Sequence, residues 1–574
     1  MASVVVLLLG LALLPLAMTD RAAATDPGFS GYTTGANVHA DVLTSGASRL
    51  VDAEVAFSGA AVDSKGLGSA VNNEMQLQVS PARSSKTSFA RGSGLELGVG
   101  QSLPIAENPT ILAGKAEADA PPNSQAERKQ VGPVDLDPIL FATLLRSDAL
   151  ANSGPGGCVL GPKDLANGQA FAEKVQLLDT AATDAEGLAE PLIATEAFEP
   201  ERGVTNSTSR LRLIPQVNEQ GVVIGPGIGL MSETYQTIAP VSIGDFTIEV
   251  LGLWRFRAVA TGLPVPGGAW IHYGPVDDDP DTPILRIVDK KTGAESAKLS
   301  TQDLLGDGGL VVPLDGILEV AAGEDPRAIN APPDADSSPT ESADGTTAAG
   351  AVDVVRVRLL QSATEPDQLV EARVGHFEAK AVVPPGGVRC DLDVKKTVPG
   401  SVRVGEPFTA LIKVTNPYDC TVTELKVIDT ITASPGILFK VTGTDPAAGV
   451  APPLNVPTSK SVITFDNLGS LTTGQSKDLK VNLIVTSARA GGEIIELAEA
   501  FSKCGIFNVD GKTLVNVLVD GKFEFRGPTL AGRPLPPTGG PTWLYVGTAL
   551  VISATGALLG RKALRLLFGG ARIN

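Results

Sequence analysis

Short apolar runs with strict alternation are the feature that most limits the possible fold. Residues 408–415 read FTALIKVT, in which every second side chain is apolar, and Asn416-Pro417 then marks a turn. Residues 479–485 repeat the same pattern before a glycine pair. A period of two is the repeat of a β-strand with one buried face, so we predict a mainly β protein.

The composition agrees with many short strands joined by turns. The 574 residues include 63 glycines and 42 prolines, while aromatic residues make up only 4%. The formal net charge of −18 is spread along the chain without a dense basic patch, which argues against a nucleic-acid partner. No cofactor is expected.

The C-terminal part of the chain carries the strongest turn signals. Residues 507–525 read FNVDGKTLVNVLVDGKFEF, with Asp-Gly pairs at 510–511 and 520–521 that are typical of β-hairpins. Strand patterns continue without helices over residues 389–527, which predicts an immunoglobulin-like β-sandwich.

The preceding region, residues 25–388, is predicted to be β-rich with a minor helical part. Residues 244–262, 351–360 and 367–383 resemble strands. Asp137-Pro138 resembles a helix start before residues 139–150, and residues 165–179 are a second candidate helix. A polar stretch near 328–350 is predicted to be a disordered insertion.

Both ends of the chain carry apolar segments. Residues 4–17 form an apolar run that precedes small residues at 22–24, which predicts a signal peptide over residues 1–24; an N-terminal anchor helix is the alternative. Residues 543–560 are long enough to span a bilayer, and the basic tail at 561–574 is typical of a cytoplasmic end. A linker with a Pro-rich motif occupies residues 528–542.

This motif resembles the Leu-Pro-x-Thr-Gly sorting signal of proteins attached to the wall of Gram-positive bacteria. Its residues are Leu535, Pro536, Pro537, Thr538 and Gly539. The resemblance implies that a sortase cleaves after Thr538 and transfers the new acyl group to an amine of the peptidoglycan precursor. The alternative is an ordinary linker before a permanent membrane helix.

Two longer stretches also resemble bacterial surface proteins. VGEPFTALIKVTNPYDC and NLGSLTTGQS, within residues 390–525, are similar to the immunoglobulin-like repeat called domain of unknown function eleven. GSGLELGVG, GLMSETYQTIAPV and TQDLLGDGGLVVP resemble the actinobacterial surface proteins named choice-of-anchor. That family implies a location and an architecture but no activity.

Four cysteines form an even set in a chain predicted to be exported, which favours two disulfides. The sequence allows three connectivities. We favour Cys420–Cys504, because both lie in the C-terminal module, and Cys158–Cys390, which would tie the first region to its last strand.

Candidate catalytic and metal sites are weak. The three histidines are His39, His272 and His376, and no nucleophile elbow accompanies them, so a structural role is favoured for His376. The acidic residues at 277–281 lack the spacing of a calcium loop and are predicted to form a solvated turn. GIFNVDGKT at 505–513 and GPGIGL at 225–230 imitate nucleotide loops but are interpreted as turns. We therefore predict no catalytic residue and no metal.

The combined expectation is a non-enzymatic structural or adhesion protein of a Gram-positive surface. Its partners would be a sortase, peptidoglycan, the membrane before processing and an unidentified surface ligand. A wall-anchored extracellular hydrolase and a permanently membrane-anchored single-span protein are the alternatives.

Overall fold

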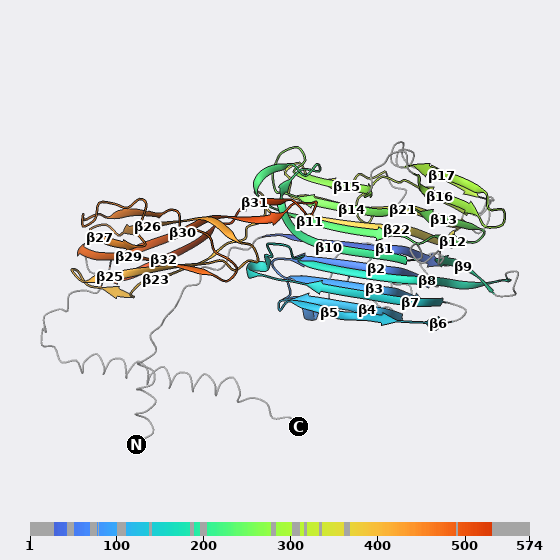
Figure 1. Cartoon of the computed structure of the whole chain (residues 1–574), viewed down its shortest axis with the longest axis horizontal. Coiled ribbons are helices and arrows are strands. Elements are labelled where there is room, and N and C mark those ends of the chain that lie inside the picture. Colours follow the sequence, from blue (N-terminus) through green and yellow to red (C-terminus); the bar gives the residue numbers. More distant parts are fainter. Residues whose placement is uncertain are drawn as a thin grey trace, which may run out of the picture.

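In the part of the chain that the structure describes, the secondary structure is almost all β-strand, and the strands form four sheets (Figure 1). The computed structural model describes residues 28–42, 51–68, 77, 80–99, 111–136, 140–183, 189–195, 204–276, 283–300, 310–314, 318–331, 336–360, 368–488 and 492–530. Within these ranges the only helical segments are the 3₁₀ turns η1 (Pro81–Arg83) and η2 (Pro155–Gly157). The prediction of a mainly β protein is confirmed.

Two large sheets form the body of the molecule. The nine-stranded sheet contains β18 (Leu310–Leu314), β19 (Leu318–Ala322), β21 (Thr347–Leu360), β22 (Gln368–Val382), β1 (Ser30–Val42), β2 (Val51–Asp63), β3 (Ser88–Val99) and β4 (Ile111–Ala120) in this order, with β20 (Thr340–Glu341) paired to β21.

The thirteen-stranded sheet covers one face of the first. Its main path is β15 (Ala269–Pro275), β14 (Leu253–Ala260), β11 (Val223–Thr237), β10 (Val204–Val217), β8 (Ala166–Thr183), β9 (Ala189–Thr195), β12 (Val241–Ile243), β13 (Phe246–Val250), β16 (Pro283–Asp289) and β17 (Glu295–Ser300). β7 (Leu140–Ala151) pairs with β8, and β5 (Ser124–Val131) and β6 (Val134–Leu136) pair with β7.

Small side chains explain how these two sheets pack with so few aromatic residues. A Cβ on Gly92 would lie 2.0 Å from the Gln169 carbonyl oxygen, and one on Gly168 would lie 2.3 Å from the Arg91 carbonyl oxygen. The backbones of β3 and β8 therefore nearly touch. Nearby, a chain of buried hydroxyls crosses the interface, from Thr33 to Thr234 at 2.7 Å and from Ser58 to Ser207 at 2.7 Å. The same two sheets also share an apolar cluster that includes Val38, Leu145 and Phe377.

The C-terminal module is a smaller two-sheet sandwich. A four-stranded sheet has the order β23 (Asp393–Thr397), β25 (Pro407–Thr415), β29 (Ser476–Ser487) and β27 (Leu438–Asp445). The facing sheet has the order β24 (Ser401–Val402), β32 (Gly521–Leu530), β30 (Glu493–Phe507), β26 (Val422–Ala433) and β28 (Lys460–Phe465), with β31 (Leu514–Leu518) paired to β30. All strand pairs in the described part are antiparallel except β24 with β32, which is parallel.

Both predicted helices are wrong, since residues 140–151 and 166–183 form β7 and β8. In β8 the inward positions are mostly alanine and glycine, so the period of two is hardly visible as a pattern of hydrophobicity. Alanine also has the highest intrinsic helix propensity, and here the packing between sheets overrides it.

The predicted disordered insertion is also wrong over residues 336–350. Thr340 pairs with Ala349 and Glu341 with Ala348, which makes a short hairpin. The Asp344 carboxylate accepts hydrogen bonds from the Thr346 amide at 3.0 Å and hydroxyl at 2.7 Å, so polar turn chemistry orders this segment.

One of the two Asp-Gly pairs behaves as predicted. Asp510-Gly511 turns the chain between β30 and β31, and the Asp510 carboxylate accepts hydrogen bonds from the Lys512 and Thr513 amides at 2.8 Å. Asp520-Gly521 does not join neighbouring strands, because β31 and β32 both pair with β30, along different parts of its length.

Candidate functional site

Both favoured cysteine pairs are bonded in the structure. Cys158 follows η2 in the body and bonds to Cys390, 232 residues away, at the entrance to the C-terminal module. Cys420 bonds to Cys504 within that module, across a separation of 84 residues. All four cysteines are buried, so a reductant can reach either disulfide only after local unfolding.

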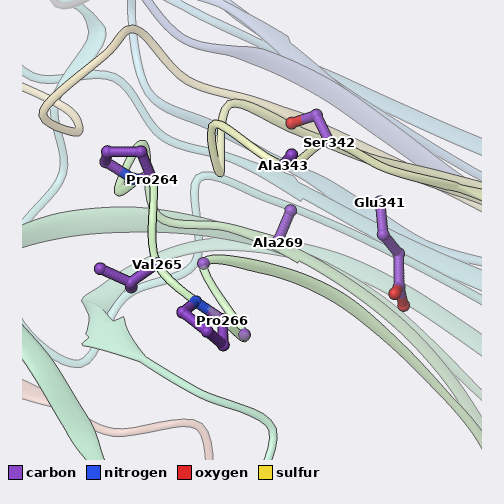
Figure 2. A pocket seen from close by; sticks show the side chains of 9 residues that line it. Pro264, Val265, Pro266, Ala269, Glu341, Ser342 and Ala343 are labelled. Atoms are coloured by element: carbon purple, nitrogen blue, oxygen red, sulfur yellow. The ribbon is translucent and has the colours of Figure 1, made fainter.

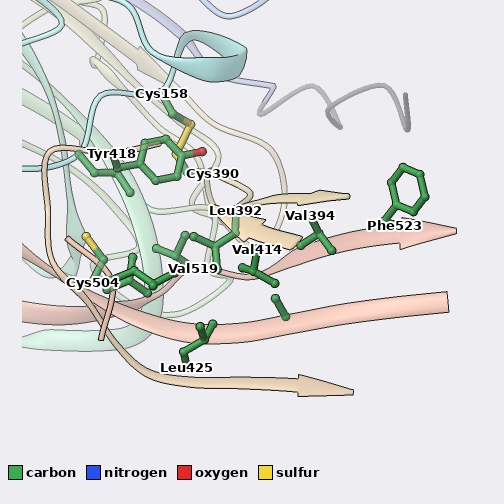
Figure 3. Packing of buried hydrophobic residues seen from close by; sticks show 14 of the residues in the cluster. Cys158, Cys390, Leu392, Val394, Val414, Tyr418, Leu425, Cys504, Val519 and Phe523 are labelled. Carbon is green, nitrogen blue, oxygen red and sulfur yellow. A yellow bond between two sulfur atoms is a disulfide. The ribbon is translucent and has the colours of Figure 1, made fainter. Parts of the chain in front are cut away.

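The first bridge lies in a continuous apolar junction between the body and the module. Figure 3 shows Cys158 and Cys390 beside Tyr418 and Leu392, which belong to one buried cluster that continues into the module. The Tyr418 hydroxyl donates a hydrogen bond to the Asp391 carbonyl oxygen at 2.8 Å, and burial raises the pKa of this phenol. Lys163 of the body and Asp419 of the module form an ion pair at 2.6 Å.

The β30–β31 turn makes a second junction. Val509 is buried against Trp270 and other apolar residues of the thirteen-stranded sheet. The Arg257 guanidinium donates a hydrogen bond to the Val509 carbonyl oxygen at 3.3 Å. The side-chain amide of Asn508 donates a hydrogen bond to the Gly221 carbonyl oxygen at 2.9 Å. The module is therefore attached at two places and does not depend on the connecting chain alone.

The predicted sorting motif, residues 535–539, and the predicted span, residues 543–560, lie outside the described residues, as do the signal peptide and the acidic residues at 277–281. Within the described part, no helix has the length and apolar character needed to cross a membrane.

His376 and His272 have different surroundings. His376 is fully buried, and its Nδ1 lies 2.6 Å from a carboxylate oxygen of Asp353, which also faces Arg327 at 3.3 Å. Burial alone would raise the pKa of Asp353, but His376 and the neighbouring arginines outweigh it and lower that pKa. His272 lies nearer the surface and contacts Glu219 at 3.2 Å. A fully buried contact between His376 and Asp353, without solvent access, fits the structural role favoured for His376.

A buried cluster around His39 was missed by the sequence reasoning. His39 and Asp41 lie on β1, and Asp52 and Glu54 lie on the neighbouring β2, with His39 directly opposite Glu54. His39 Nε2 lies 3.5 Å from Asp41, and its Nδ1 lies 3.9 Å from Asp52 and 3.8 Å from Glu54. Burial by itself lowers the pKa of His39, but the Asp41 carboxylate, aided by Asp52, raises it to about 9.

This cluster has the donor types of a divalent-cation site. One ligand atom each from His39, Asp41 and Asp52 lie within 4.8 Å of one another. The His39 Nδ1 and one Glu54 oxygen have no hydrogen-bond partner in the interior. An imidazole with several carboxylates suits Zn²⁺ or Mn²⁺. The signal was present in the sequence: VHADV at 38–42 and VDAEV at 51–55 both place charged residues on one strand face.

A surface hollow of about 390 Å³ lies where the 264–269 loop meets the β20 turn (Figure 2). Pro264, Val265 and Pro266 form one wall, and Glu341, Ser342 and Ala343 form the other. Glu341 accepts a hydrogen bond from the Ile271 amide at 2.7 Å. With one carboxylate and no histidine in its lining, this hollow does not provide the paired acid and base that a hydrolase needs.

Comparisons with known proteins give no family. No family model and no curated protein matches the chain. The solved structures that resemble it include AvmM, which catalyses macrocyclization in alchivemycin A biosynthesis, at 14% identity and TM-score 0.17, covering 26% of this chain and 95% of that one. A cohesin module from Clostridium perfringens has 13% identity and TM-score 0.14, covering 25% and 98%. A protein described as membrane-anchored from Corynebacterium diphtheriae has 10% identity and TM-score 0.14, covering 68% and 94%. Scores this low carry no functional argument.

Proposed function

We propose that this chain is a structural or adhesion-type surface protein of a Gram-positive bacterium, exported and covalently attached to peptidoglycan by a sortase. The C-terminal sandwich would be an immunoglobulin-like stalk that holds the larger two-sheet body away from the wall. Its partners would be the sortase during processing, peptidoglycan afterwards and a surface ligand of the body.

The observation that carries this proposal is the pair of buried disulfides. Such bonds form and persist in oxidising compartments outside the cytoplasm, and every cysteine of the chain is used in one. Export is also what residues 1–24 predict, and a surface location is what the order of motif, apolar segment and basic tail predicts. The two-point junction suits a rigid stalk rather than a flexible linker.

The attachment is tested with Thr538→Ala, because Thr538 would supply the acyl group. We expect the wild-type protein to end at Thr538, to carry peptidoglycan fragments and to need a wall hydrolase for release. Thr538→Ala should still be exported but should remain extractable by detergent alone. Intact mass and fractionation provide the measurement.

Thr542→Ala is the matched control, since it lies just outside the motif and should be processed as wild type. If wild-type protein keeps residues beyond Gly539 and detergent alone releases it, the motif is only a linker. The chain would then be a single-span membrane protein.

A further inference from the structure

Three charged side chains meet in the apolar core of the C-terminal sandwich. Lys396 lies on β23 of the four-stranded sheet, and Asp429 on β26 and Glu496 on β30 belong to the facing sheet. The side chains of all three are fully shielded from solvent. They are not part of either disulfide or of the junction with the body.

The geometry places an amine against two carboxyl groups. Lys396 Nζ lies 2.5 Å from an oxygen of Asp429, to which it donates a hydrogen bond, and 2.5 Å from an oxygen of Glu496. Glu496 is directly opposite Ile431 in the β26–β30 ladder, so Asp429, two residues away, projects from the same face. The amine therefore crosses from one sheet to reach both groups on the other.

As separate ions, these groups are costly to bury. The second oxygen of Asp429 has no hydrogen-bond partner in the interior, and apolar side chains of the module core surround the set. Two carboxylates with one ammonium leave a net negative charge in a low-dielectric core, where each ion loses most of its hydration. A neutral product would remove this cost.

Burial raises the pKa of Asp429 and of Glu496, although Lys396 opposes the rise in each case. Burial therefore favours the neutral form of each carboxyl group, and a neutral carboxyl group in contact with a neutral amine is the pair that can condense. Fixed contact at 2.5 Å supplies the proximity that makes an otherwise slow condensation effective.

We propose that Lys396 and Asp429 condense to form an intramolecular amide bond, with Glu496 as the catalytic acid–base. A proton passes from the Lys396 ammonium to the Asp429 carboxylate, and the lone pair of the resulting amine attacks Cγ of the Asp429 carboxyl group, so that the carbon–nitrogen bond forms. The Glu496 carboxylate accepts a proton from the nitrogen and passes it to the departing hydroxyl group. The carbon–oxygen bond breaks, one water leaves, and no redox partner is needed.

Asp429 is assigned as the bonded partner because it receives the well-aligned hydrogen bond from Lys396. Glu496 contacts the same nitrogen at 2.5 Å, within reach to accept its proton. The product links β23 to β26 across the sandwich. Unlike either disulfide, this link would survive reduction.

Intact-mass measurement of the full-length protein under reducing, denaturing conditions tests the bond directly. We expect wild-type protein to be lighter than its sequence by one water molecule. Trypsin should fail to cleave after Lys396 and should release a branched peptide that contains residues 396 and 429. Lys396→Met and Asp429→Ala should restore the full mass.

Glu496→Gln keeps both reacting groups and should remove or greatly slow the mass loss, which separates catalysis from bonding. Lys395→Met is the matched control, because Lys395 is exposed on the same strand, and it should retain the mass loss. The wild-type measurement does not depend on whether any variant folds. A wild-type protein with full mass and normal cleavage after Lys396 overturns the proposal, as does a mass loss that persists in Asp429→Ala.

Discussion

At the scale of single residues, Glu233 is the clearest case of a buried charge with defined partners. It is fully buried on β11 and lies between Arg210 on β10 and Arg257 on β14, with guanidinium–carboxylate contacts at 2.7 Å on both sides. Burial alone would raise the pKa of Glu233, but Arg257 and Arg210 together lower it. The three residues join three neighbouring strands of the thirteen-stranded sheet.

Glu233→Gln should therefore destabilise the body, because two guanidinium groups lose their counter-charge. The expected loss is about 3–5 kcal/mol of unfolding free energy, the cost typical of breaking a buried ion pair. Urea unfolding followed by the fluorescence of Trp254 and Trp270 would measure it, since both lie in this sheet. Glu219→Gln, which removes an exposed contact, should change the value by less than about 1 kcal/mol.

The contacts of Glu233 with Arg210 and Arg257 should also make the stability of the protein depend on pH in a defined direction. The pKa of Glu233 is lower in the folded state than the ordinary value of 4.5. The ionised Glu233 carboxylate therefore makes its full contribution to the free energy of unfolding above that value, and this contribution is lost as the pH falls toward the folded-state pKa. The difference between wild type and Glu233→Gln should therefore shrink below about pH 4.5. A difference that stays constant down to strongly acidic pH would contradict this role.

At the scale of elements, the close approach of β3 and β8 depends on glycine. Gly168→Ala would place a methyl group 2.3 Å from one backbone oxygen and 2.5 Å from another, so the sheets would have to separate. We expect a loss of about 1–3 kcal/mol by overpacking. Gly400→Ala, where a new Cβ meets nothing within 4 Å, should be nearly neutral. The urea denaturation midpoints of the two variants, each compared with that of the wild type, measure these losses.

The same interface explains which elements could be predicted. Strands β25 and β29 alternate between large apolar and polar residues, and the sequence shows their period directly. Strands β7 and β8 face a neighbouring backbone, so small residues occupy many inward positions and the hydrophobic period is weak. Pairing between distant strands, such as β1 with β22, leaves no local signal at all.

The candidate sites also differ in how far the sequence could predict them. Cysteine pairing followed from count and position, and the structure forms both bridges. The His39 cluster needs two adjacent strands in register, and the Lys396 set needs two facing sheets. Neither arrangement can be deduced from spacing along the chain, because the contacts are tertiary.

The Cys420–Cys504 bond should contribute measurably to the C-terminal sandwich. The bonded cysteines are separated by 84 positions, and closing a loop of this size in the unfolded chain is worth about 4.5 kcal/mol in the chain-entropy model. The double variant Cys420→Ser, Cys504→Ser should lower the calorimetric unfolding temperature of the full-length protein by several degrees. Alkylation of the wild-type protein without reductant should label neither cysteine, and recovery of an alkylated residue would contradict the bond.

At the scale of the whole molecule, body and module should behave as one unit. The Cys158–Cys390 bond, the apolar junction and the contacts of the β30–β31 turn all cross the boundary near residue 390. The sequence predicted a domain boundary there and favoured the Cys158–Cys390 bond, but the apolar junction and the contacts of the β30–β31 turn leave no pattern along the chain.

The two disulfides also limit how far the protein can stretch. When the chain is pulled at its ends, the loop closed by Cys158 and Cys390 (sequence separation 232) and the loop closed by Cys420 and Cys504 (sequence separation 84) carry no tension while both bonds are intact. At about 3.5 Å per extended residue, the two bonds withhold roughly 1,100 Å of contour length that the reduced chain can release. A surface tether built in this way can extend only its segments outside the two loops in an oxidising environment, and the looped residues become extensible only after reduction.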